Sequence, residues 1–179
     1  MLMTPVNDKL SLALPRPTLD GPALFSLLDR NRKAFTPYLP WVANLKSVED
    51  EVQFLKLANV QAGHAQSLNL VIWVQNQAAG MISFNQINHS RASADIGYWL
   101  GQPFQGRGIM TASVKAMVQL GFSDYSLNRL TIEAAVENQA SNRVALKAGF
   151  QLEGLLRQNE RLADGRFHDE NLYGRVKKL

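Results

Sequence analysis

The sequence has 179 residues, a formal net charge of +4 and no cysteine. A hydrophobic content of 46% with 19% charged residues fits a globular chain and argues against disorder, and the length predicts a single domain over residues 1–179. The lack of cysteine excludes disulfides, a thiol nucleophile, iron–sulfur clusters and cysteine-ligated zinc. No apolar run approaches the length of a membrane span and the first residues lack an apolar signal core, so we expect a cytoplasmic protein.

Hydrophobic periodicity predicts a strand and two helices in the first third of the chain. Apolar and polar residues alternate over 10–14, as is typical of a half-buried strand, and Pro15 and Pro17 end that strand. Thr18 offers an N-cap for the first helix, and Ser47 with Asp50 resembles a capping box that opens the second. In chain order we expect a strand over 10–14, a helix over 20–35, an irregular proline-containing segment over 36–41 and a helix with an apolar stripe over 48–62.

The pattern changes after Gly63, where β-rich runs separated by turn residues begin. Residues 76–80 predict a hairpin turn, Gly149 is placed to end a helix, and Asp164-Gly165 predicts a turn between the last two strands. We expect strands over 68–74, 81–87, 94–100, 130–136, 151–161 and 171–177, and helices over 109–125 and 139–148. Because strands and helices do not strictly alternate, this order predicts a mixed α+β domain and argues against a doubly wound one.

The segment Gln105-Gly106-Arg107-Gly108-Ile109-Met110 lies between a predicted strand and a predicted helix. Glycines let backbone N–H groups approach a ligand, the helix N-terminus adds a partial positive charge and Arg107 adds a cation, so the segment suits a phosphate or pyrophosphate. It is not a P-loop, because Arg107-Gly108 replaces the required Lys and Ser/Thr. Nor is it a dinucleotide fingerprint, because Thr111 occupies the third glycine position. A tight turn without a ligand is the alternative interpretation of this segment alone.

A second motif runs from Asn138 to Phe150 and reads Asn-Gln-Ala-Ser-Asn-Arg-Val-Ala-Leu-Lys-Ala-Gly-Phe. Together the two motifs resemble the GCN5-related N-acetyltransferase superfamily, whose acetyl-CoA loop reads Gln/Arg-x-x-Gly-x-Gly/Ala and whose next helix runs from an Asn to a Gly-Phe pair. Gln105-x-x-Gly108 matches the loop, and Met110 departs from its usual small last residue. The strand over 96–100, the segment over 38–41 and Asn138-x-x-Ser141 are similar to one branch, the RimJ/RimL-type protein N-terminal acetyltransferases. The resemblance covers residues 10–176.

This resemblance implies a central, mixed, mostly antiparallel, splayed β-sheet flanked by helices, with acetyl-CoA as the cosubstrate. The pantetheine arm would lie in the gap of the sheet, and the pyrophosphate would lie in the glycine loop. A lip over the acceptor is implied for Tyr38, Leu39 and Trp41, whereas apolar packing of that segment on the core is the alternative. The resemblance assigns cofactor contacts to Trp99, Leu100, Gln105, Gly106, Arg107, Gly108, Ile109, Met110, Thr111, Asn138, Asn142 and Lys147.

Acetyl transfer from a thioester to an amine needs a neutral amine, a polarised carbonyl and a thiolate that can leave. An α-amino group has a pKa of about 7.7–8.0 and a lysine side chain about 10.4, so an N-terminal acceptor needs only a modest base. In many members of the superfamily a tyrosine protonates the thiolate, and its position here is Ala145. In the branch that this chain resembles, Ser141 takes that role, and the alternative for Ser141 is to cap its own helix.

A carboxylate near the acceptor is needed as the base. Glu160 lies late in the penultimate predicted strand, which borders the acceptor cleft in the fold that the resemblance implies. Its alternative is an exposed strand residue paired with Arg157 or Arg161. Asp95 and Glu133 also lie on predicted strands, and the sequence leaves both open as the base.

The three histidines, His64, His89 and His168, lack metal-ligand spacing, so no metal is expected. The cluster His168-Asp169-Glu170 is predicted in a solvated loop. The lysines and arginines are spread along the chain and no basic, aromatic-interleaved stripe is present, which argues against direct nucleic-acid binding. No membrane partner is expected either.

Within this branch the resemblance implies an acceptor at a protein N-terminus, the N-terminal serine of the acidic ribosomal stalk protein, and a homodimeric enzyme. A basic enzyme would be steered toward such an acidic partner. Two alternatives stay open. One is a small-molecule acetyltransferase acting on a polyamine or an aminoglycoside, whose cationic acceptor favours an acidic cleft. The other is a CoA-binding regulatory module without turnover.

Overall fold

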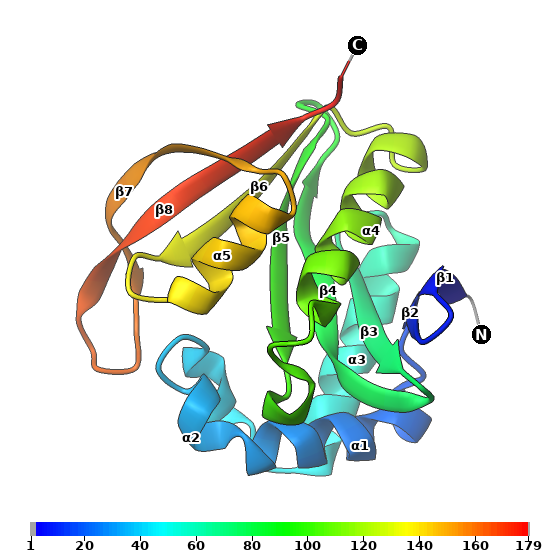
Figure 1. Ribbon diagram of the computed structural model, residues 1–179. Coiled ribbons are helices and arrows are strands. Elements are labelled where there is room, and N and C mark those ends of the chain that lie inside the picture. The colour runs from blue at the N-terminus through cyan, green and yellow to red at the C-terminus, as the bar shows by residue number, and fades with distance from the viewer. Residues whose placement is uncertain (1–2, 179) are drawn as a thin grey trace.

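The computed structural model describes residues 3–178. Its strands form one eight-stranded sheet in the order β1-β2-β3-β4-β5-β6-β8-β7 (Figure 1). Neighbouring strands pair antiparallel except for β5 and β6, which are parallel. The strands are β1 (Met3–Asn7), β2 (Leu10–Ala13), β3 (Leu68–Val74), β4 (Gln77–Asn88), β5 (Ser93–Leu100), β6 (Arg129–Ala135), β7 (Gln151–Arg161) and β8 (Phe167–Val176).

Helices cover both faces of this sheet (Figure 1). They are α1 (Pro17–Arg30), α2 (Arg32–Phe35), α3 (Val48–Gly63), α4 (Ile109–Ser123) and α5 (Gln139–Lys147), with short 3-10 helices η1 (Pro40–Asn44) and η2 (Gln102–Phe104). The core under α4 and α5 is built around side chains such as Phe84, Met117 and Ile132. The core under α1 and α3 is smaller and includes Leu55 and Val71. Within residues 3–178, no helix is long and apolar enough to span a membrane.

The sheet splays between β5 and β6, and this splay makes room for a site. Residues Ser93–Asp95 pair with Arg129–Thr131, whereas β5 stays paired with β4 as far as Leu100. From Ile96 to Leu100, the edge of β5 that faces β6 therefore carries backbone N–H and C=O groups without a strand partner. The mixed, mostly antiparallel, splayed sheet with flanking helices confirms the predicted fold class.

Several local predictions are confirmed. Ser47 Oγ accepts a hydrogen bond from the Asp50 N–H at 3.2 Å, and the Asp50 carboxylate accepts one from the Ser47 N–H at 2.8 Å, which is the capping box of α3. Gly149 follows α5 with a φ of +85°, a conformation that favours glycine at the end of a helix. The strand β7 has the predicted bounds.

The start of the first helix differs from the prediction. The helix α1 begins at Pro17, and Thr18 lies inside its first turn, so Thr18 is not its N-cap. Pro17 suits the first helical position because its missing N–H has no helical acceptor there. Arg16 precedes the helix, and the Asp20 carboxylate accepts hydrogen bonds from the Arg16 N–H at 2.8 Å and from its guanidinium at 2.7 Å. Asn31, with φ −103° and ψ 7°, then separates α1 from α2, so the predicted continuous helix is two helices.

Strand bounds also differ at both ends of the chain. The strand β1 is absent from the prediction because its five residues include Pro5 and show no alternation, and it forms by pairing with β2. The strand β8 begins at Phe167, four residues earlier than predicted, so His168-Asp169-Glu170 lies in a strand and the predicted solvated loop is wrong. These polar residues form strand because β8 is flanked by β6 and β7 on both sides, and Glu170 is buried there.

Candidate active site

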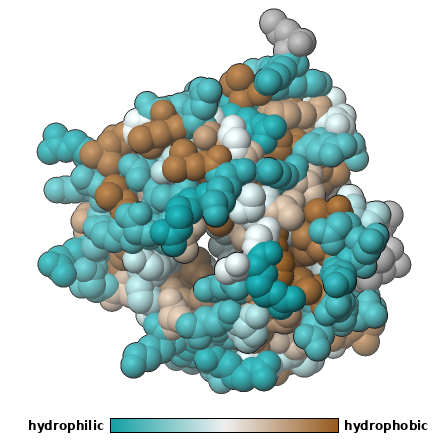
Figure 2. All heavy atoms as spheres, in the orientation of Figure 1, coloured by the Kyte–Doolittle hydropathy of each residue, from teal (hydrophilic) through white to brown (hydrophobic). Residues whose placement is uncertain are grey.

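A cavity of about 640 Å³ occupies the gap between β5 and β6. The face of the molecule in Figure 2 is hollowed near its centre. A volume of this size is typical of pockets for small molecules and cofactors. The side chains and backbone around it come from β5, β6, the glycine loop, α5, the segment after α2, and the β7–β8 hairpin. Its polar lining includes Tyr38, Tyr98, Gln105, Thr111, Glu133, Asn138, Ser141, Arg143, Lys147, Glu160 and Glu170.

The glycine loop forms one end of the cavity. Gly106 and Gly108 have φ angles of +73° and +74°, and a Cβ at either position would meet no atom within 4 Å. Glycine is therefore favoured by the left-handed backbone and not by crowding. Gly108 precedes α4 without a side-chain cap, and the N–H groups of Ile109 and Met110 belong to the first turn, where an α-helix has no internal acceptor. The loop thus has free N–H donors and the positive end of a helix dipole, an arrangement that suits an anion.

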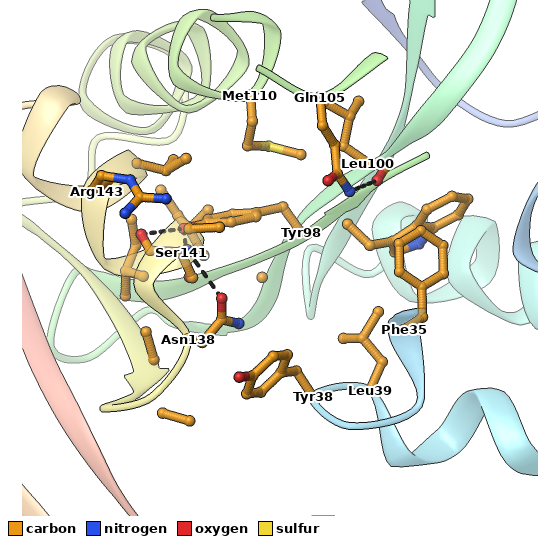
Figure 3. A pocket seen from close by; sticks show the side chains of 18 of the residues that line it. Phe35, Tyr38, Leu39, Tyr98, Leu100, Gln105, Met110, Asn138, Ser141 and Arg143 are labelled. Carbon is orange, nitrogen blue, oxygen red and sulfur yellow. Dashed lines mark hydrogen bonds between the residues drawn. The ribbon is translucent and has the colours of Figure 1, made fainter. Parts of the chain in front are cut away.

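Gln105 lines the cavity and also holds the glycine loop to the sheet, and its contact with the cofactor stays a prediction. Its side-chain amide donates a hydrogen bond to the carbonyl oxygen of Leu100 at 2.7 Å, which ties the glycine loop to the end of β5 (Figure 3). Leu100 and Trp99 lie on the unpaired part of β5, and both line the cavity. The Trp99 ring packs edge-on against Phe35, with 5.7 Å between the ring centroids. A ligand in the cavity would therefore contact Trp99 through its backbone N–H and C=O groups.

The start of α5 forms a second wall. The Asn138 side chain accepts a hydrogen bond from the Ser141 N–H at 3.2 Å and so caps the helix. Asn138 is the cap, so the alternative in which Ser141 caps its own helix is wrong. The Ser141 hydroxyl oxygen instead lies 2.9 Å from the hydroxyl oxygen of Tyr98 (Figure 3). Both side chains line the cavity.

Asn142 does not reach the cavity, and the predicted cofactor contact of its side chain is corrected. Its amide donates hydrogen bonds to the carbonyl oxygens of Ala135, at 2.9 Å, and Asn138, at 2.7 Å. Its carbonyl oxygen accepts from Asn171 and from the Tyr173 hydroxyl, both at 2.7 Å. Since these bonds use both ends of a buried side chain, Asn142 holds α5 against β6 and β8.

Three other predicted site residues lie outside the cavity lining. Arg107 is exposed at the tip of the glycine loop. Trp41 lies on η1 and is 44% exposed, whereas Tyr38 and Leu39 of the same predicted lip do line the cavity. The Asp95 carboxylate accepts hydrogen bonds from the Asn85 side chain at 2.6 Å and the Gln86 N–H at 3.1 Å, so it serves the β4–β5 pair.

The lip is held in place by an arginine that the sequence did not single out. The Arg32 guanidinium on α2 donates hydrogen bonds to the carbonyl oxygens of Val42 and Leu45, the latter at 2.7 Å, and pairs with Asp29 at 3.0 Å. It therefore connects α2 to η1 on both sides of the segment that carries Tyr38. This bridge limits how far the lip can move from the cavity.

Carboxylates form the opposite wall. Glu133 on β6, Glu160 on β7 and Glu170 on β8 all line the cavity. The Asn159 side-chain amide donates to Glu170 at 2.7 Å and to Glu133 at 3.1 Å. Burial raises the pKa of Glu133, the charge of Glu170 raises it further, and the Asn159 hydrogen bond lowers it. This wall suits a cationic or proton-releasing group.

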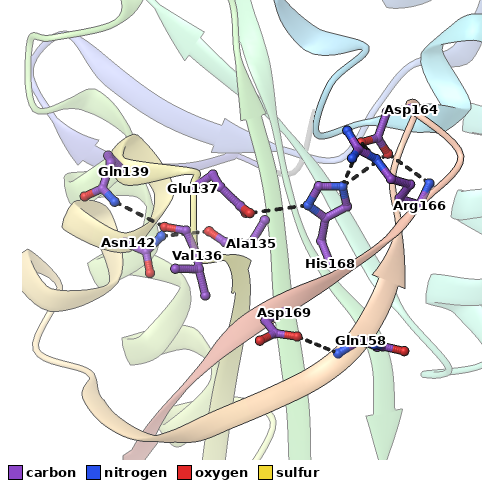
Figure 4. A network of polar contacts seen from close by, with 10 residues as sticks. All are labelled: Ala135, Val136, Glu137, Gln139, Asn142, Gln158, Asp164, Arg166, His168 and Asp169. Atoms are coloured by element: carbon purple, nitrogen blue, oxygen red, sulfur yellow. Dashed lines mark hydrogen bonds and ion pairs between the residues drawn. The ribbon is translucent and has the colours of Figure 1, made fainter.

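The turn that connects β7 to β8 is fastened beside this wall (Figure 4). His168 lies between two carboxylates, with Nε2 3.1 Å from Asp164 and Nδ1 3.4 Å from Glu137. These neighbours raise the pKa of His168, and the hydrogen bond that His168 donates to Asp164 has the largest effect. His168 therefore joins the hairpin turn to the β6–α5 connection, which positions Glu160 and Glu170 over the cavity.

Tyr98, Arg143, Asn159 and Glu170 are site residues that the sequence interpretation missed. Tyr98 lies in the predicted strand over 94–100, but only the alternation of side chains along this strand could have suggested that its ring faces the gap. Arg143 lines the cavity two residues after Ser141 and adds a cation beside Lys147. The other two become neighbours only through the β7–β8 pairing, which has no local sequence signal.

A splayed sheet with a left-handed glycine loop at a helix N-terminus is the architecture of an acetyltransferase, and residues 9–151 match the Acetyltransferase (GNAT) domain family. The chain belongs to this family and is an N-acetyltransferase, as the motifs at 105–110 and 138–150 predicted.

Named relatives agree with this assignment. The chain is 36% identical over 156 residues to the ribosomal-protein-serine acetyltransferase of Escherichia coli (strain K12), covering 86% of this chain and 85% of the relative. The structure of RimL, the ribosomal L7/L12 α-N-protein acetyltransferase, in complex with coenzyme A has a TM-score of 0.93 at 34% identity and covers 98% of both chains. The structure of the microcin C7 self-immunity acetyltransferase MccE with acetyl-CoA and AMP has a TM-score of 0.91 at 34% identity, covering 96% of this chain and 94% of that one.

Proposed function

We propose that this enzyme transfers the acetyl group of acetyl-CoA to the N-terminal α-amine of a protein, the N-terminal serine of the ribosomal stalk protein. The observation that carries the proposal is a single cavity with anion-binding N–H groups at one end and carboxylates at the other. The relatives with the names given above support the class of acceptor. The net charge of +4 supports an acidic protein partner.

The residues around the cavity fit acetyl-CoA. The glycine loop and the start of α4 would hold the pyrophosphate, and Arg143 and Lys147 add cations on the neighbouring helix. The unpaired edge of β5 at Trp99 and Leu100 offers backbone groups to the amide-bearing pantetheine arm, in the manner of an added strand. These contacts would place the thioester beside the start of α5.

Glu160 is proposed as the base. Among the hydrogen bonds of residues 3–178, none uses the Glu160 carboxylate, so it is free to accept a proton from the attacking amine or through a water. Glu133 and Glu170, in contrast, share the Asn159 amide. An α-amine has a pKa of about 7.7–8.0, so a carboxylate of modest basicity suffices to remove its proton as the C–N bond forms.

Ser141 is proposed as the acid. When the tetrahedral intermediate collapses, the C–S bond breaks and the sulfur takes the bonding electrons. The Ser141 hydroxyl proton moves to the sulfur as the Ser141 oxygen takes up a proton returned through water from the protonated base, so that coenzyme A leaves with a neutral thiol and Ser141 is again a hydroxyl. A thiol pKa of about 8.5 makes this thiolate a fair leaving group, which a neutral hydroxyl can assist.

The carboxylate wall favours a second candidate acceptor. A polyamine or an aminoglycoside is cationic, and Glu133, Glu160 and Glu170 would attract it as well as they attract an N-terminal ammonium. A small-molecule amine acetyltransferase therefore stays the competing function.

We also propose that the enzyme is a homodimer, which a measurement of its molar mass in solution would test.

The deciding experiment measures thiol release from acetyl-CoA with three kinds of acceptor. These are N-terminal peptides that begin with serine, lysine peptides with blocked N-termini, and polyamines. Turnover only with free N-termini, strongly reduced in Glu160→Gln and Ser141→Ala, is expected. Asp95→Asn, outside the cavity, is the matched control and should retain activity, while Glu133→Gln separates the two candidate bases.

Other outcomes would contradict parts of this proposal. Turnover with polyamines instead would move the enzyme to the small-molecule class. Loss of activity in Glu133→Gln but not in Glu160→Gln would reassign the base. Tight CoA binding without thiol release from any acceptor would favour a regulatory module.

A further inference from the structure

We propose that Tyr98 is a positioning residue for Ser141: its phenol keeps its proton and donates it in a hydrogen bond to Ser141 Oγ, which directs the serine proton toward the departing sulfur. This inference rests on the proposed role of Ser141. It adds a residue from another strand of the sheet to the leaving-group side of the site.

The contact joins two elements that meet only in the tertiary structure. Tyr98 lies on the unpaired part of β5, and Ser141 lies in the first turn of α5 (Figure 3). The phenol oxygen is 2.9 Å from Ser141 Oγ and 3.3 Å from the Ser141 carbonyl oxygen. The shorter distance is to the hydroxyl, and both residues line the cavity.

The direction of this hydrogen bond follows from the chemistry of the two hydroxyls. A phenol is a stronger proton donor than an aliphatic alcohol, so the phenol favours the donor role. Burial raises the pKa of Tyr98 to about 12, which keeps the phenol protonated at neutral pH. The Ser141 oxygen accepts this proton with one lone pair, and its own hydrogen is left for another acceptor.

The serine is constrained on its backbone as well. Its N–H is held by the Asn138 side chain at 3.2 Å, so the first turn of α5 is fixed where the hydroxyl projects. Ser141 is the one hydroxyl-bearing residue of α5, and Ala145, one turn later on the same helix, is fully buried in the core. The helix therefore brings no phenol of its own, and the phenol beside the Ser141 hydroxyl comes from β5.

Positioning changes the leaving-group step without changing its balance. The C–S bond breaks, the sulfur takes the electron pair and receives the Ser141 proton, and the base takes the proton lost by the amine. As its proton departs, the Ser141 oxygen takes up a proton that the protonated base returns through water, so no serine alkoxide forms and both residues end the step in their starting protonation states. Tyr98 keeps its own proton and its hydrogen bond to Ser141 Oγ during this exchange. The transferred proton thus comes from an oriented hydroxyl and not from one that rotates freely.

A double-mutant cycle with Tyr98→Phe and Ser141→Ala tests the inference. We expect Tyr98→Phe to lower kcat about tenfold, as for loss of one oriented hydrogen bond, with the KM for acetyl-CoA and the Kd for coenzyme A within about twofold of the wild-type values. In the Ser141→Ala background the same change should have no further effect, because Tyr98 acts through Ser141. Tyr125→Phe, a partly buried tyrosine outside the cavity lining, should leave kcat unchanged.

Three results would overturn the inference. Full additivity of the two single effects would show that Tyr98 acts independently of Ser141. Unchanged kcat in Tyr98→Phe would show that the contact does not serve the reaction, and weakened coenzyme A binding with unchanged kcat would make Tyr98 a binding residue. Wild-type kcat in Ser141→Ala instead refutes the proposed acid, and no turnover by the wild-type enzyme with any amine refutes the proposed function. Both failures are distinguishable from a failure at Tyr98 alone.

Discussion

The side-chain amide of Asn159 on β7 donates a hydrogen bond to the Glu133 carboxylate on β6 at 3.1 Å, although β8 lies between these two strands. The reach across β8 is possible because β7 shifts its register between Leu156 and Glu160, where Gln158 has a φ of +49°. The Gln158 N–H donates to Asp169 at 2.8 Å in this irregular stretch (Figure 4). A bulge in an edge strand therefore brings a neutral donor into the carboxylate wall.

Two substitutions around this contact should move the pKa of Glu133 in opposite directions. Burial and the charge of Glu170 raise this pKa, and the Asn159 hydrogen bond lowers it. We expect Glu170→Gln to lower the pKa of Glu133 and Asn159→Ala to raise it. Carboxyl carbon NMR titration with labelled glutamate measures the pKa, and Glu133→Gln assigns the resonance. Shifts in the same direction for both variants would contradict this account of the wall.

Gly108→Ala should weaken cofactor binding and destabilise the fold together. The residue has a φ of +74° with open space around it, so alanine would strain the backbone by about 1 kcal/mol and not clash with a neighbour. We expect a lower free energy of unfolding and a higher Kd for coenzyme A, measured by chemical denaturation and calorimetry. Gly63→Ala at the end of α3 is the matched control, since Gly63 also has open space but no positive φ, and neither property should worsen. Unchanged Kd in Gly108→Ala would remove the glycine loop from the cofactor site.

Glu51 should make the fold less stable as the pH rises. It is 1% exposed in α3, and within the described chain its Oε1 has no hydrogen-bond partner. Burial raises the pKa of Glu51 to about 7. This is above the unfolded value of about 4.3. Between these two values Glu51 is ionised in the unfolded state but still protonated in the folded state, so the free energy of unfolding falls as the pH rises through this range.

Glu51→Gln should therefore flatten the pH dependence of stability. Between pH 5 and pH 8 we expect the wild-type protein to lose about 2 kcal/mol of unfolding free energy that the variant retains. Urea denaturation at both pH values measures this difference. Glu49→Gln on the exposed face of the same helix is the control and should keep the wild-type slope. An identical slope in Glu51→Gln would show that burial does not raise the pKa of Glu51 above its unfolded value.

Substitutions of Tyr38 and Trp41, both in the lip, should differ in their effect on the KM for the acceptor peptide. Both side chains are similarly exposed, 38% and 44%, but only Tyr38 lines the cavity. Loss of roughly 1 kcal/mol of apolar contact predicts that Tyr38→Ala raises the KM for the acceptor peptide about fivefold. The KM for acetyl-CoA should not change, and Trp41→Ala should alter neither constant. Equal effects of the two variants on the acceptor KM would mean that the whole segment, including η1, contacts the acceptor.

The sequence predicted those elements whose signals are local. The capping box at Ser47 and Asp50 and the glycine after α5 each depend on residues within one turn, and both appear where expected. The prediction of Thr18 as the N-cap was wrong because the helix already begins at Pro17, one residue earlier. His168-Asp169-Glu170 misled because its polarity is typical of a loop, whereas pairing on both sides makes it a strand.

The candidate site divides in the same way. The glycine loop and the start of α5 are continuous motifs, so the sequence by itself determined the acetyltransferase class and located both segments. Only the tertiary structure decided that the Asn142 side chain spends its hydrogen bonds on buried neighbours, that Tyr98 contacts Ser141, and that Asn159 donates to Glu133. These pairings depend on where β5 separates from β6 and how β7 bulges beside β8. Strand register over such distances along the chain is set by packing of the whole sheet and has no short-range signal.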